Sequence, residues 1–264
     1  MDDLLNIVEK INDNTIILTF VDYKYIPLFD IFYSYFEKLD LKNLLVIALD
    51  LHTYNHLHKY NKFHIFYTDY NLYNKDLFWK FRLSLINYIF KSSMKNIIHT
   101  DIDCLWYKNI VEDIQKLEYD ITGSIAFGFP EEFVKKYGFI MCCGFYYIKY
   151  NVNTKDFFDK IIHQNTNIND DQLLMNTYIF NNHKSISIYT DDNLITKCIE
   201  TVDNLKIGII SDSIISRTYK PSLYCFHPHL PSPDIDNKIR ELYAKMEMKM
   251  EMKMEMGIDG CVKK

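Results

Sequence analysis

Short apolar runs alternate with longer, helically spaced segments over the first hundred residues of the chain. Four of these runs predict strands, over residues 15–21, 43–50, 62–68 and 95–103. Two segments between them carry apolar residues at helical spacing, over residues 25–39 and 75–90. Strands this apolar are buried on both faces, which is typical of a parallel sheet covered by helices. We therefore predict an α/β fold with a mostly parallel central sheet and helices on both faces.

The second half of the chain is less regular. Further strands are predicted over residues 119–126, 139–150, 185–189, 206–210 and 222–227. Helices are predicted over residues 154–163 and 170–180. Because no Gly- or Ser-rich linker interrupts these segments, we predict one domain over residues 1–234 with an elaborated C-terminal half.

Residues 235–264 depart from this pattern. They contain a four-residue Lys-Met-Glu-Met repeat, made of residues that favour helices. We expect a C-terminal helix followed by a partly disordered tail. The repeat is interpreted as an expansion without a role of its own, with a Met-rich contact for a partner as the alternative.

Composition narrows the class of function. The 264 residues suffice for a large core, and the net charge of −5 argues against affinity for nucleic acid through phosphate neutralisation. No apolar stretch is long enough to span a membrane, and an acidic N-terminus argues against a secretory signal. We predict a cytoplasmic protein, in the host cytoplasm if the abundant Lys, Asn, Ile and Tyr reflect an AT-rich viral genome. The bias makes the rarer Gly, Trp and Arg more informative.

Asp101 and Asp103 form the sharpest candidate site. They follow the apolar run that begins at residue 95, and side chains two residues apart in an extended segment point the same way. Two carboxylates held close together repel each other, and a divalent cation removes that cost. Mg²⁺ and Mn²⁺ prefer carboxylates together with phosphate oxygens and water. The pattern therefore predicts a metal site, with an acidic pair in a surface turn as the alternative.

Other motifs surround this pair in a defined order. Trp106 is the third residue after Asp103, and Asp50 ends an earlier strand. Downstream lie the segments CCGFYYIKYN, over residues 142–151, and DDQLLMN, over residues 170–176. Together these motifs make residues 14–230 resemble GT-A glycosyltransferases, and in particular the nucleotide-diphospho-sugar transferase family that includes plant xylosyl- and arabinosyltransferases.

The resemblance implies a Rossmann-like GT-A fold and an enzyme that depends on Mn²⁺ or Mg²⁺. Such an enzyme moves a sugar from a nucleotide-diphosphate donor, a UDP-sugar above all, to a hydroxyl group of a glycan or protein, with retention of configuration. Asp103 would bind the metal directly, and Asp101 would contact the metal through water or the ribose. His227 or His229 would complete the metal shell through a neutral imidazole.

Further residues are candidates for binding the donor. Lys80 and Arg82 would contact the diphosphate or nucleotide, against the alternative that both are solvated helix charges. Asp50 would contact the base or ribose, cap the following helix, or do both. Gly144 lies inside an aromatic strand, which indicates a bulge or a close approach to a ligand, or packing against a ring.

Asp171 and Gln172 are the candidate catalytic residues. If configuration is retained, either side chain would stabilise oxocarbenium character at the anomeric carbon, and if it is inverted, Asp171 would be the general base. One departure concerns Cys142, which stands where the family usually has Asn. A thiol lacks the two donors and the carbonyl acceptor of an amide, so this position bears on activity.

Two other functions remain open on the sequence. The first is a GT-A-fold protein that binds a nucleotide sugar without turning it over, which Cys142 and the lack of an obvious base favour. The second is a phosphatase of the haloacid-dehalogenase type, which also places Asp-x-Asp after a buried strand. That motif usually lies on the first strand and continues to Thr or Val, whereas Leu105 stands at that position here.

Overall fold

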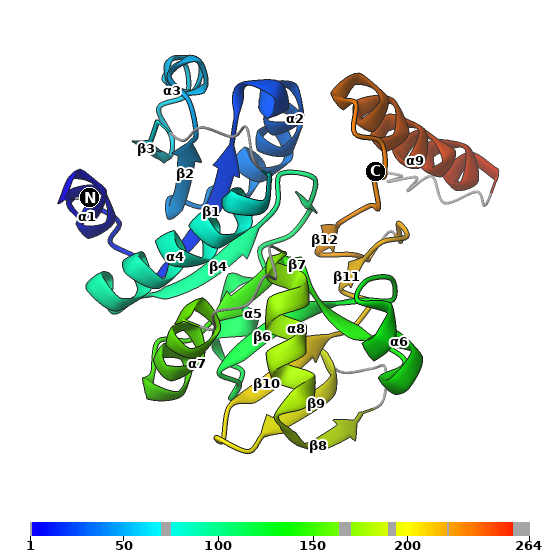
Figure 1. Cartoon of the computed structure of the whole chain (residues 1–264). Helices are drawn as coiled ribbons and strands as arrows, with labels where there is room; N and C mark the ends of the chain where they lie inside the picture. The colour runs from blue at the N-terminus through cyan, green and yellow to red at the C-terminus, as the bar shows by residue number, and fades with distance from the viewer. Residues whose placement is uncertain (1, 70–74, 164–169, 190–193, 221, 256–264) are drawn as a thin grey trace, which may run out of the picture.

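A mixed sheet of nine strands forms the centre of the protein (Figure 1). The computed structural model describes residues 2–69, 75–163, 170–189, 194–220 and 222–255. The strands lie in the order β3-β2-β1-β4-β7-β6-β10-β9-β8. Their bounds are β1 (Thr15–Val21), β2 (Leu44–Ala48), β3 (His64–Tyr67), β4 (Asn96–Thr100), β6 (Ile121–Ala126), β7 (Ile140–Ile148), β8 (His183–Ile188), β9 (Ile195–Thr201) and β10 (Lys206–Ile210).

All strands of this sheet except β7 and β9 run in the same direction. Consecutive residues of β1 alternate between two buried clusters, with Ile16 and Leu18 in one and Ile17 in the other. Because successive side chains of a strand point to opposite faces, the sheet has apolar layers on both sides. The prediction of a largely parallel sheet covered on both faces is confirmed.

Helices supply both layers. Their bounds are α1 (Asp2–Glu9), α2 (Ile26–Phe36), α3 (Leu51–Leu57), α4 (Lys75–Ser93), α5 (Val111–Gln115), α6 (Glu131–Tyr137), α7 (Val152–His163), α8 (Asp171–Asn181) and α9 (Ile235–Glu255), with 3-10 turns over Tyr23–Tyr25 and Glu37–Leu39. The sequence pattern did not predict α1, α5, α6 or β9, nor the short strands Leu105–Trp106 and Ile215–Ser216. Of the strand expected over residues 222–227, only Cys225–Phe226 is a strand.

A second, three-stranded sheet holds the segment that follows β4. It contains β11 (Ile215–Ser216), β12 (Cys225–Phe226) and β5 (Leu105–Trp106), in that order. Trp106 is fully buried against Phe36 and Phe145, and its indole N–H donates to Thr100 Oγ1 at 3.1 Å. This contact ties the small sheet to the end of β4 and fixes the turn between them.

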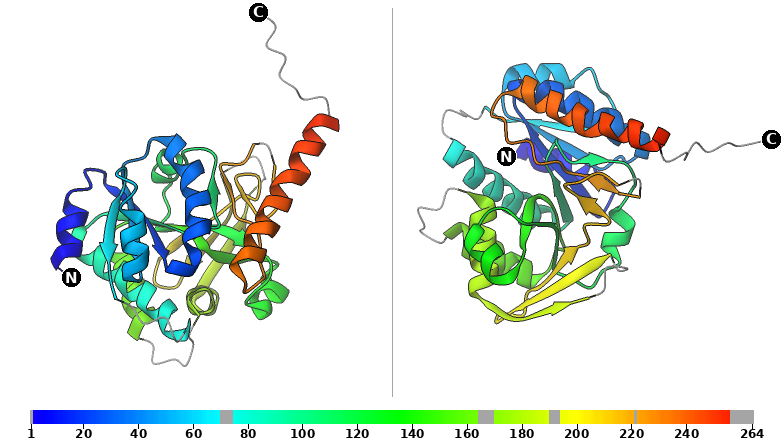
Figure 2. Two further views of the ribbon diagram at one scale, coloured as in Figure 1. Left: turned by 90° about the horizontal axis from the view of Figure 1, so that it is seen from above. Right: turned by 90° about the vertical axis from the view of Figure 1, so that its right-hand side faces the viewer.

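The helix α9 runs along the outside of the domain near α2 (Figures 1 and 2). Leu242 is fully buried in the same cluster as α2, and the Lys238 ammonium lies 5.7 Å from the ring centroid of Tyr25. Residues 256–264 of the predicted tail lie outside the described residues. Within the described part of the chain, no helix combines the length and apolarity needed to cross a membrane.

Candidate functional site

Asp101 and Asp103 lie in a tight turn at the carboxyl end of β4. The Cys104 N–H donates to the Asp101 carbonyl at 3.0 Å, which closes the turn. The Asp101 N–H donates to the Gly144 carbonyl at 2.8 Å, which anchors it to β7. Ligands of α/β sheets bind at the carboxyl ends of strands, so this turn has the location of a binding site.

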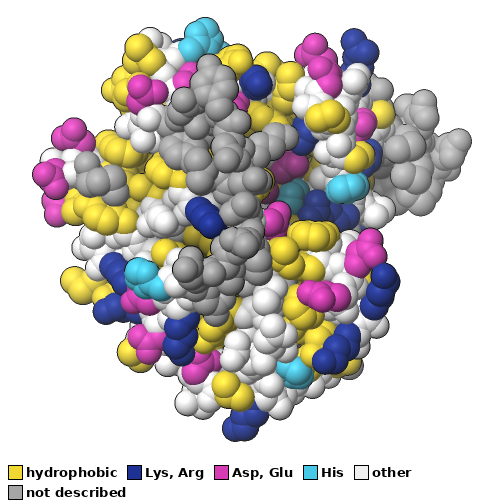
Figure 3. Space-filling model, in the orientation of Figure 1, with side chains coloured by type: hydrophobic (Ala, Val, Ile, Leu, Met, Phe, Trp, Pro, Cys, Tyr) yellow, Lys and Arg dark blue, Asp and Glu magenta, His cyan; other side chains and the backbone are white. Residues whose placement is uncertain are grey.

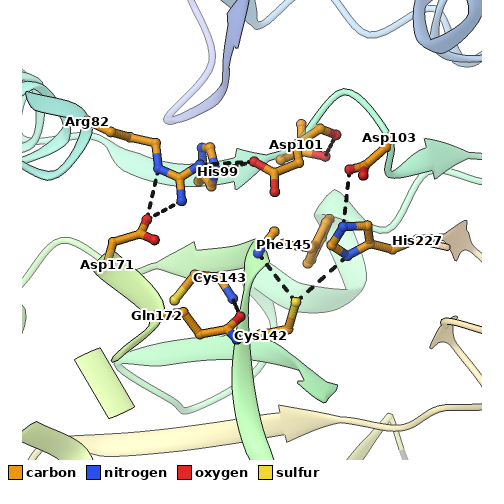
Figure 4. Close-up of polar contacts among 12 residues, drawn as sticks. Arg82, His99, Asp101, Asp103, Cys142, Cys143, Phe145, Asp171, Gln172 and His227 are labelled. Atoms are coloured by element: carbon orange, nitrogen blue, oxygen red, sulfur yellow. Dashed lines mark hydrogen bonds and ion pairs between the residues drawn. The ribbon is translucent and has the colours of Figure 1, made fainter. Parts of the chain in front are cut away.

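The small sheet brings His227 to this turn. β12 pairs antiparallel with β5, with Phe226 opposite Leu105, so that the next residue reaches the Asp103 turn. The His227 N–H also donates to the Ser216 carbonyl at 2.9 Å. As a result, His227 Nε2 lies 3.2 Å from Asp103 Oδ1 (Figure 4). Two short strands far apart in sequence thereby assemble one cluster.

This cluster fits a divalent cation. One ligand atom each from Asp101, Asp103 and His227 lies within 4.8 Å of the others. The two carboxylates are partly exposed, with 35% and 20% of the side chains accessible, while the imidazole is buried. Burial lowers the pKa of His227, but the Asp103 carboxylate and the Cys142 sulfur outweigh this and raise it above the ordinary value. The negative groups around His227 therefore favour a positive charge at this position. Carboxylate oxygens together with an imidazole are suitable ligands for Mn²⁺ or Mg²⁺.

Arg82 connects this cluster to α8. Its Nη1 donates to Asp101 Oδ1 at 3.0 Å, while Nε donates to Asp171 Oδ2 at 2.9 Å and Nη2 contacts the same oxygen. The guanidinium is buried and stacks over Trp79 at 4.4 Å. Burial raises the pKa of Asp171 to about 6, although the Arg82 charge acts in the opposite direction. The Arg82 guanidinium thus binds the carboxylates of Asp101 and Asp171, which would otherwise repel each other.

His99 supports Asp101 from the strand below it. Its Nε2 lies 3.2 Å from Asp101 Oδ1, and the ring is buried. Burial and the nearby Arg82 charge lower the pKa of His99 to about 4, so the ring is neutral and its Nε2–H donates to the carboxylate. Burial raises the pKa of Asp101, but Arg82 and His99 together hold it below the ordinary value. Asp101 is therefore an anion that is ready to accept a cation.

Gly144 makes room for His227. The register between β6 and β7 shifts beside it, from Gly123 opposite Tyr146 to Ser124 opposite Cys142. A Cβ atom at Gly144 would lie 2.0 Å from His227 Cε1 and 2.8 Å from Asp101 Oδ2. The bulge predicted from the sequence is present, and the close approach is to the ring of a candidate ligand.

We expect Gly144→Ala to damage the cluster. The new methyl group displaces the His227 ring, which should lower the free energy of unfolding by about 1–3 kcal/mol and weaken Mn²⁺ binding about tenfold or more. Urea unfolding and Mn²⁺ titration measure the two effects. Gly128→Ala is the matched control, because a Cβ there meets nothing within 4 Å. Equal behaviour of the two variants would contradict this account of Gly144.

Gln172 and Asn176 fasten the start of α8 to β7. Gln172 Oε1 accepts from the Cys143 N–H at 3.0 Å, and its Nε2 donates to the Phe129 carbonyl at 2.5 Å. Asn176 exchanges two hydrogen bonds with the backbone of Met141, at 2.9 and 2.8 Å. Asp170 caps α8 by accepting from the Leu173 N–H at 2.7 Å. These contacts place Asp171 beside Arg82.

Three other predicted site residues have different surroundings. Asp50 is the N-cap of α3, accepts from the Thr53 N–H at 2.8 Å, and also accepts from the Tyr23 N–H at 2.7 Å. Lys80 is exposed on α4, and because it lies two residues before Arg82, its side chain leaves the helix in a different direction from the buried guanidinium. His229 is exposed and lies outside the cluster that contains His227.

Two residues of the site were missed by the sequence reasoning. His99 lies two positions before Asp101, and the period of a strand would have placed both side chains on one face. Arg217 is one of only three arginines, and its Nη2 donates to Cys142 Sγ at 2.8 Å. Acidic, histidine and basic side chains gather in a recess on this face of the molecule (Figure 3).

Comparison with known proteins identifies the family and the fold. The model of the nucleotide-diphospho-sugar transferase family matches residues 39–229. No curated protein sequence matches the chain. The solved structure of galactosyltransferase LgtC, in complex with donor and acceptor sugar analogues, matches with a TM-score of 0.51 at 11% identity, over 88% of this chain and 95% of that chain. The structural match confirms the GT-A fold, and since the family model spans most of the sequence, the chain belongs to the nucleotide-diphospho-sugar transferase family of glycosyltransferases.

Proposed function

We propose that the protein transfers a sugar from a nucleotide-diphosphate donor, a UDP-sugar, to a hydroxyl group of a glycan or protein with retention of configuration, and that it requires Mn²⁺ or Mg²⁺. The observation that carries the proposal is the meeting of Asp101, Asp103 and His227 at the carboxyl end of β4. Three ligand atoms are fewer than the six that Mg²⁺ or Mn²⁺ binds, which leaves coordination positions for phosphate oxygens and water.

Asp103 and His227 would hold the cation directly, and Asp101 would hold it directly or through water. When bound there, a divalent cation supplies Lewis-acid stabilisation of the charge on the departing nucleoside diphosphate. Asp101 is positioned for this by Arg82 and His99, which both contact its Oδ1. These two contacts would hold the Asp101 carboxylate in place before the donor binds, which is how preorganised charges contribute to catalysis.

The donor would lie along the same edge of the sheet. Lys80 is exposed and would contact the diphosphate, whereas the Arg82 guanidinium already holds two carboxylates. Asp50 would contact the ribose or base from its position as the cap of α3. Gly144 would allow the donor and the His227 ring to approach β7 closely.

Asp171 is our candidate for stabilising positive charge at the anomeric carbon. Arg82 contacts its Oδ2 twice, so Oδ1 lies outside that ion pair. Gln172 acts with it as a positioning residue, because both ends of its amide are bound to backbone groups. A fixed carboxylate beside the sugar stabilises an oxocarbenium-like transition state.

We expect turnover to fall as the pH drops below about 6, because the raised pKa of Asp171 means that its carboxylate becomes protonated in that range. Measurement of kcat against pH, with saturating metal and donor, tests this. The Asp171→Asn variant carries no titrating group at this position. It should therefore be slower at neutral pH and lack this acidic limb, and retention of the full limb in that variant would assign it to another group.

A panel of UDP- and GDP-sugars tests the function itself. Purified protein is incubated with each donor, with Mn²⁺ or with chelator, and released nucleoside diphosphate is measured. Release that depends on Mn²⁺ from at least one donor supports the proposal. Thermal stabilisation by donors without any release would instead favour a nucleotide-sugar-binding protein, which Cys142 in place of the usual Asn makes the second candidate. Hydrolysis of small phosphoesters alone would favour a phosphatase.

A further inference from the structure

Cys142 carries a buried thiol next to the bulge of β7. Three nitrogens lie near its sulfur: Arg217 Nη2 and the Gly144 N–H donate to it at 2.8 and 3.5 Å, and His227 Nδ1 lies 3.8 Å away. The neighbouring Cys143 faces the other way, and its sulfur packs at 3.5 Å from Met175 Sδ. The two adjacent sulfur atoms therefore have different neighbours, and Figure 4 shows the Cys142 sulfur on the side of His227 and the Cys143 sulfur pointing away from it.

The arrangement makes the Cys142 sulfur an acceptor. A guanidinium and a backbone N–H have no lone pair to accept a proton, so the sulfur is the acceptor of both contacts. The sulfur thus already accepts from two donors. A third group that approaches it, the Nδ1 of His227, is therefore best matched when it also carries a hydrogen.

The two nitrogens of His227 face opposite environments. Nε2 lies 3.2 Å from Asp103 Oδ1, on the side of the acidic cluster, and Nδ1 faces Cys142. An imidazole that offers the Nε2 lone pair to a cation must carry its proton on Nδ1. Only 4% of His227 is exposed, so this Nδ1–H needs an acceptor from the protein.

Arg217 links the Cys142 sulfur to the backbone next to His227. Its Nη1 donates to the Pro228 carbonyl at 3.5 Å, while its Nη2 donates to Cys142. The guanidinium also interacts electrostatically with Asp103. The Cys142 sulfur therefore lies next to two side chains: His227, the candidate metal ligand, and Arg217, which also binds the backbone of the residue after His227.

We propose that Cys142 is a positioning residue for His227: its sulfur accepts the hydrogen bond from Nδ1–H, fixes the ring orientation and directs Nε2 toward Asp101 and Asp103. This inference rests on the proposed metal-dependent function. In this role the lone pairs of the Cys142 sulfur are sufficient, and the amide of the Asn that the family usually has at this position is not needed. Groups that orient a metal-binding histidine in this way commonly contribute about 10–100-fold to metal affinity.

The first test measures Mn²⁺ affinity of the full chain by titration. Cys142→Ala should weaken Mn²⁺ binding about tenfold, and Cys142→Ser, which keeps an acceptor, should weaken it less. Cys143→Ala is the matched control, because it removes an equally buried thiol whose sulfur packs against Met175 Sδ, and it should leave Mn²⁺ affinity unchanged. Wild-type affinity in Cys142→Ala, or no difference between the Ala and Ser variants, would overturn the inference.

The second test uses the metal-free protein. Isotope-labelled histidine allows NMR of the ring nitrogens, and the His227 signals are assigned by their loss in His227→Gln. We expect a His227 Nδ1–H that exchanges slowly with solvent in the wild type and rapidly in Cys142→Ala, with urea unfolding to confirm that the variant is folded. If the wild type binds no Mn²⁺, the proposed function fails, whereas equally slow exchange in both proteins would refute the role of Cys142.

Discussion

Asp103→Asn should reduce Mn²⁺-dependent release of nucleoside diphosphate about a thousandfold, equivalent to roughly 4 kcal/mol of transition-state stabilisation. The substitution keeps the size of the side chain but removes the charge that faces His227 Nε2 at 3.2 Å. An amide is a poor ligand for a hard cation compared with a carboxylate. The loss should appear in both Mn²⁺ affinity and turnover, measured by titration and by nucleotide release.

Urea unfolding of Asp103→Asn shows whether the loss of Mn²⁺ binding and turnover arises from misfolding. Asp103 is paired with the buried His227, but this imidazole can lose its proton when the charge of Asp103 is removed, so the neutral variant should remain folded with only a modestly lower urea midpoint. Asp156→Asn is the matched control, because it removes an exposed acidic charge on α7 and should leave Mn²⁺ binding and release unchanged. If Asp103→Asn retained Mn²⁺-dependent release at the wild-type rate, the acidic cluster would not be the metal site.

The core of the fold was predictable because it follows local periodicity. Apolar runs such as 15–21 and 206–210 correspond to β1 and β10. The Asp101–Asp103 pair follows a buried strand as predicted, but it lies in a turn after Thr100, whereas the sequence predicted an extended strand up to residue 103. These features depend on side chains within a few residues of one another. A pattern of period two or of helical spacing is enough to reveal them.

The histidine of the site was not predictable in the same way. His227 reaches Asp103 because β12 pairs with β5, and each of these strands is only two residues long. A strand that short has no periodicity, and its pairing links positions more than a hundred residues apart. The sequence therefore left His227 and His229 as equal candidates, although the structure places them in different surroundings.

Arg82 shows how composition can identify a residue without assigning its role. Its rarity as one of three arginines drew attention to it as a diphosphate ligand. The structure shows it buried between Asp101, in the turn after β4, and Asp171, at the start of α8. Neither contact follows from local sequence, because the partners lie 19 and 89 residues away. Its charge first serves to hold the two acidic segments together.

Arg82→Met should lower the free energy of unfolding by about 3–5 kcal/mol, because Asp171 would remain buried without its partner. The aliphatic side chain keeps much of the packing on Trp79, so the loss reports mainly on charge. Urea unfolding at neutral pH measures it. Arg240→Met is the matched control, since Arg240 is exposed on α9 and its replacement should change stability by less than about 0.5 kcal/mol.

The double variant Arg82→Met with Asp171→Asn shows whether the unpaired charge is the cause. Neutralising Asp171 alone leaves Arg82 with its contact to Asp101, so that single change should be the milder one. In the double variant no uncompensated buried carboxylate remains at α8, and part of the stability lost in Arg82→Met should return. Strict additivity of the two losses would mean that Arg82 and Asp171 contribute to stability independently, and that the destabilisation of Arg82→Met arises from lost packing instead of from the ion pair.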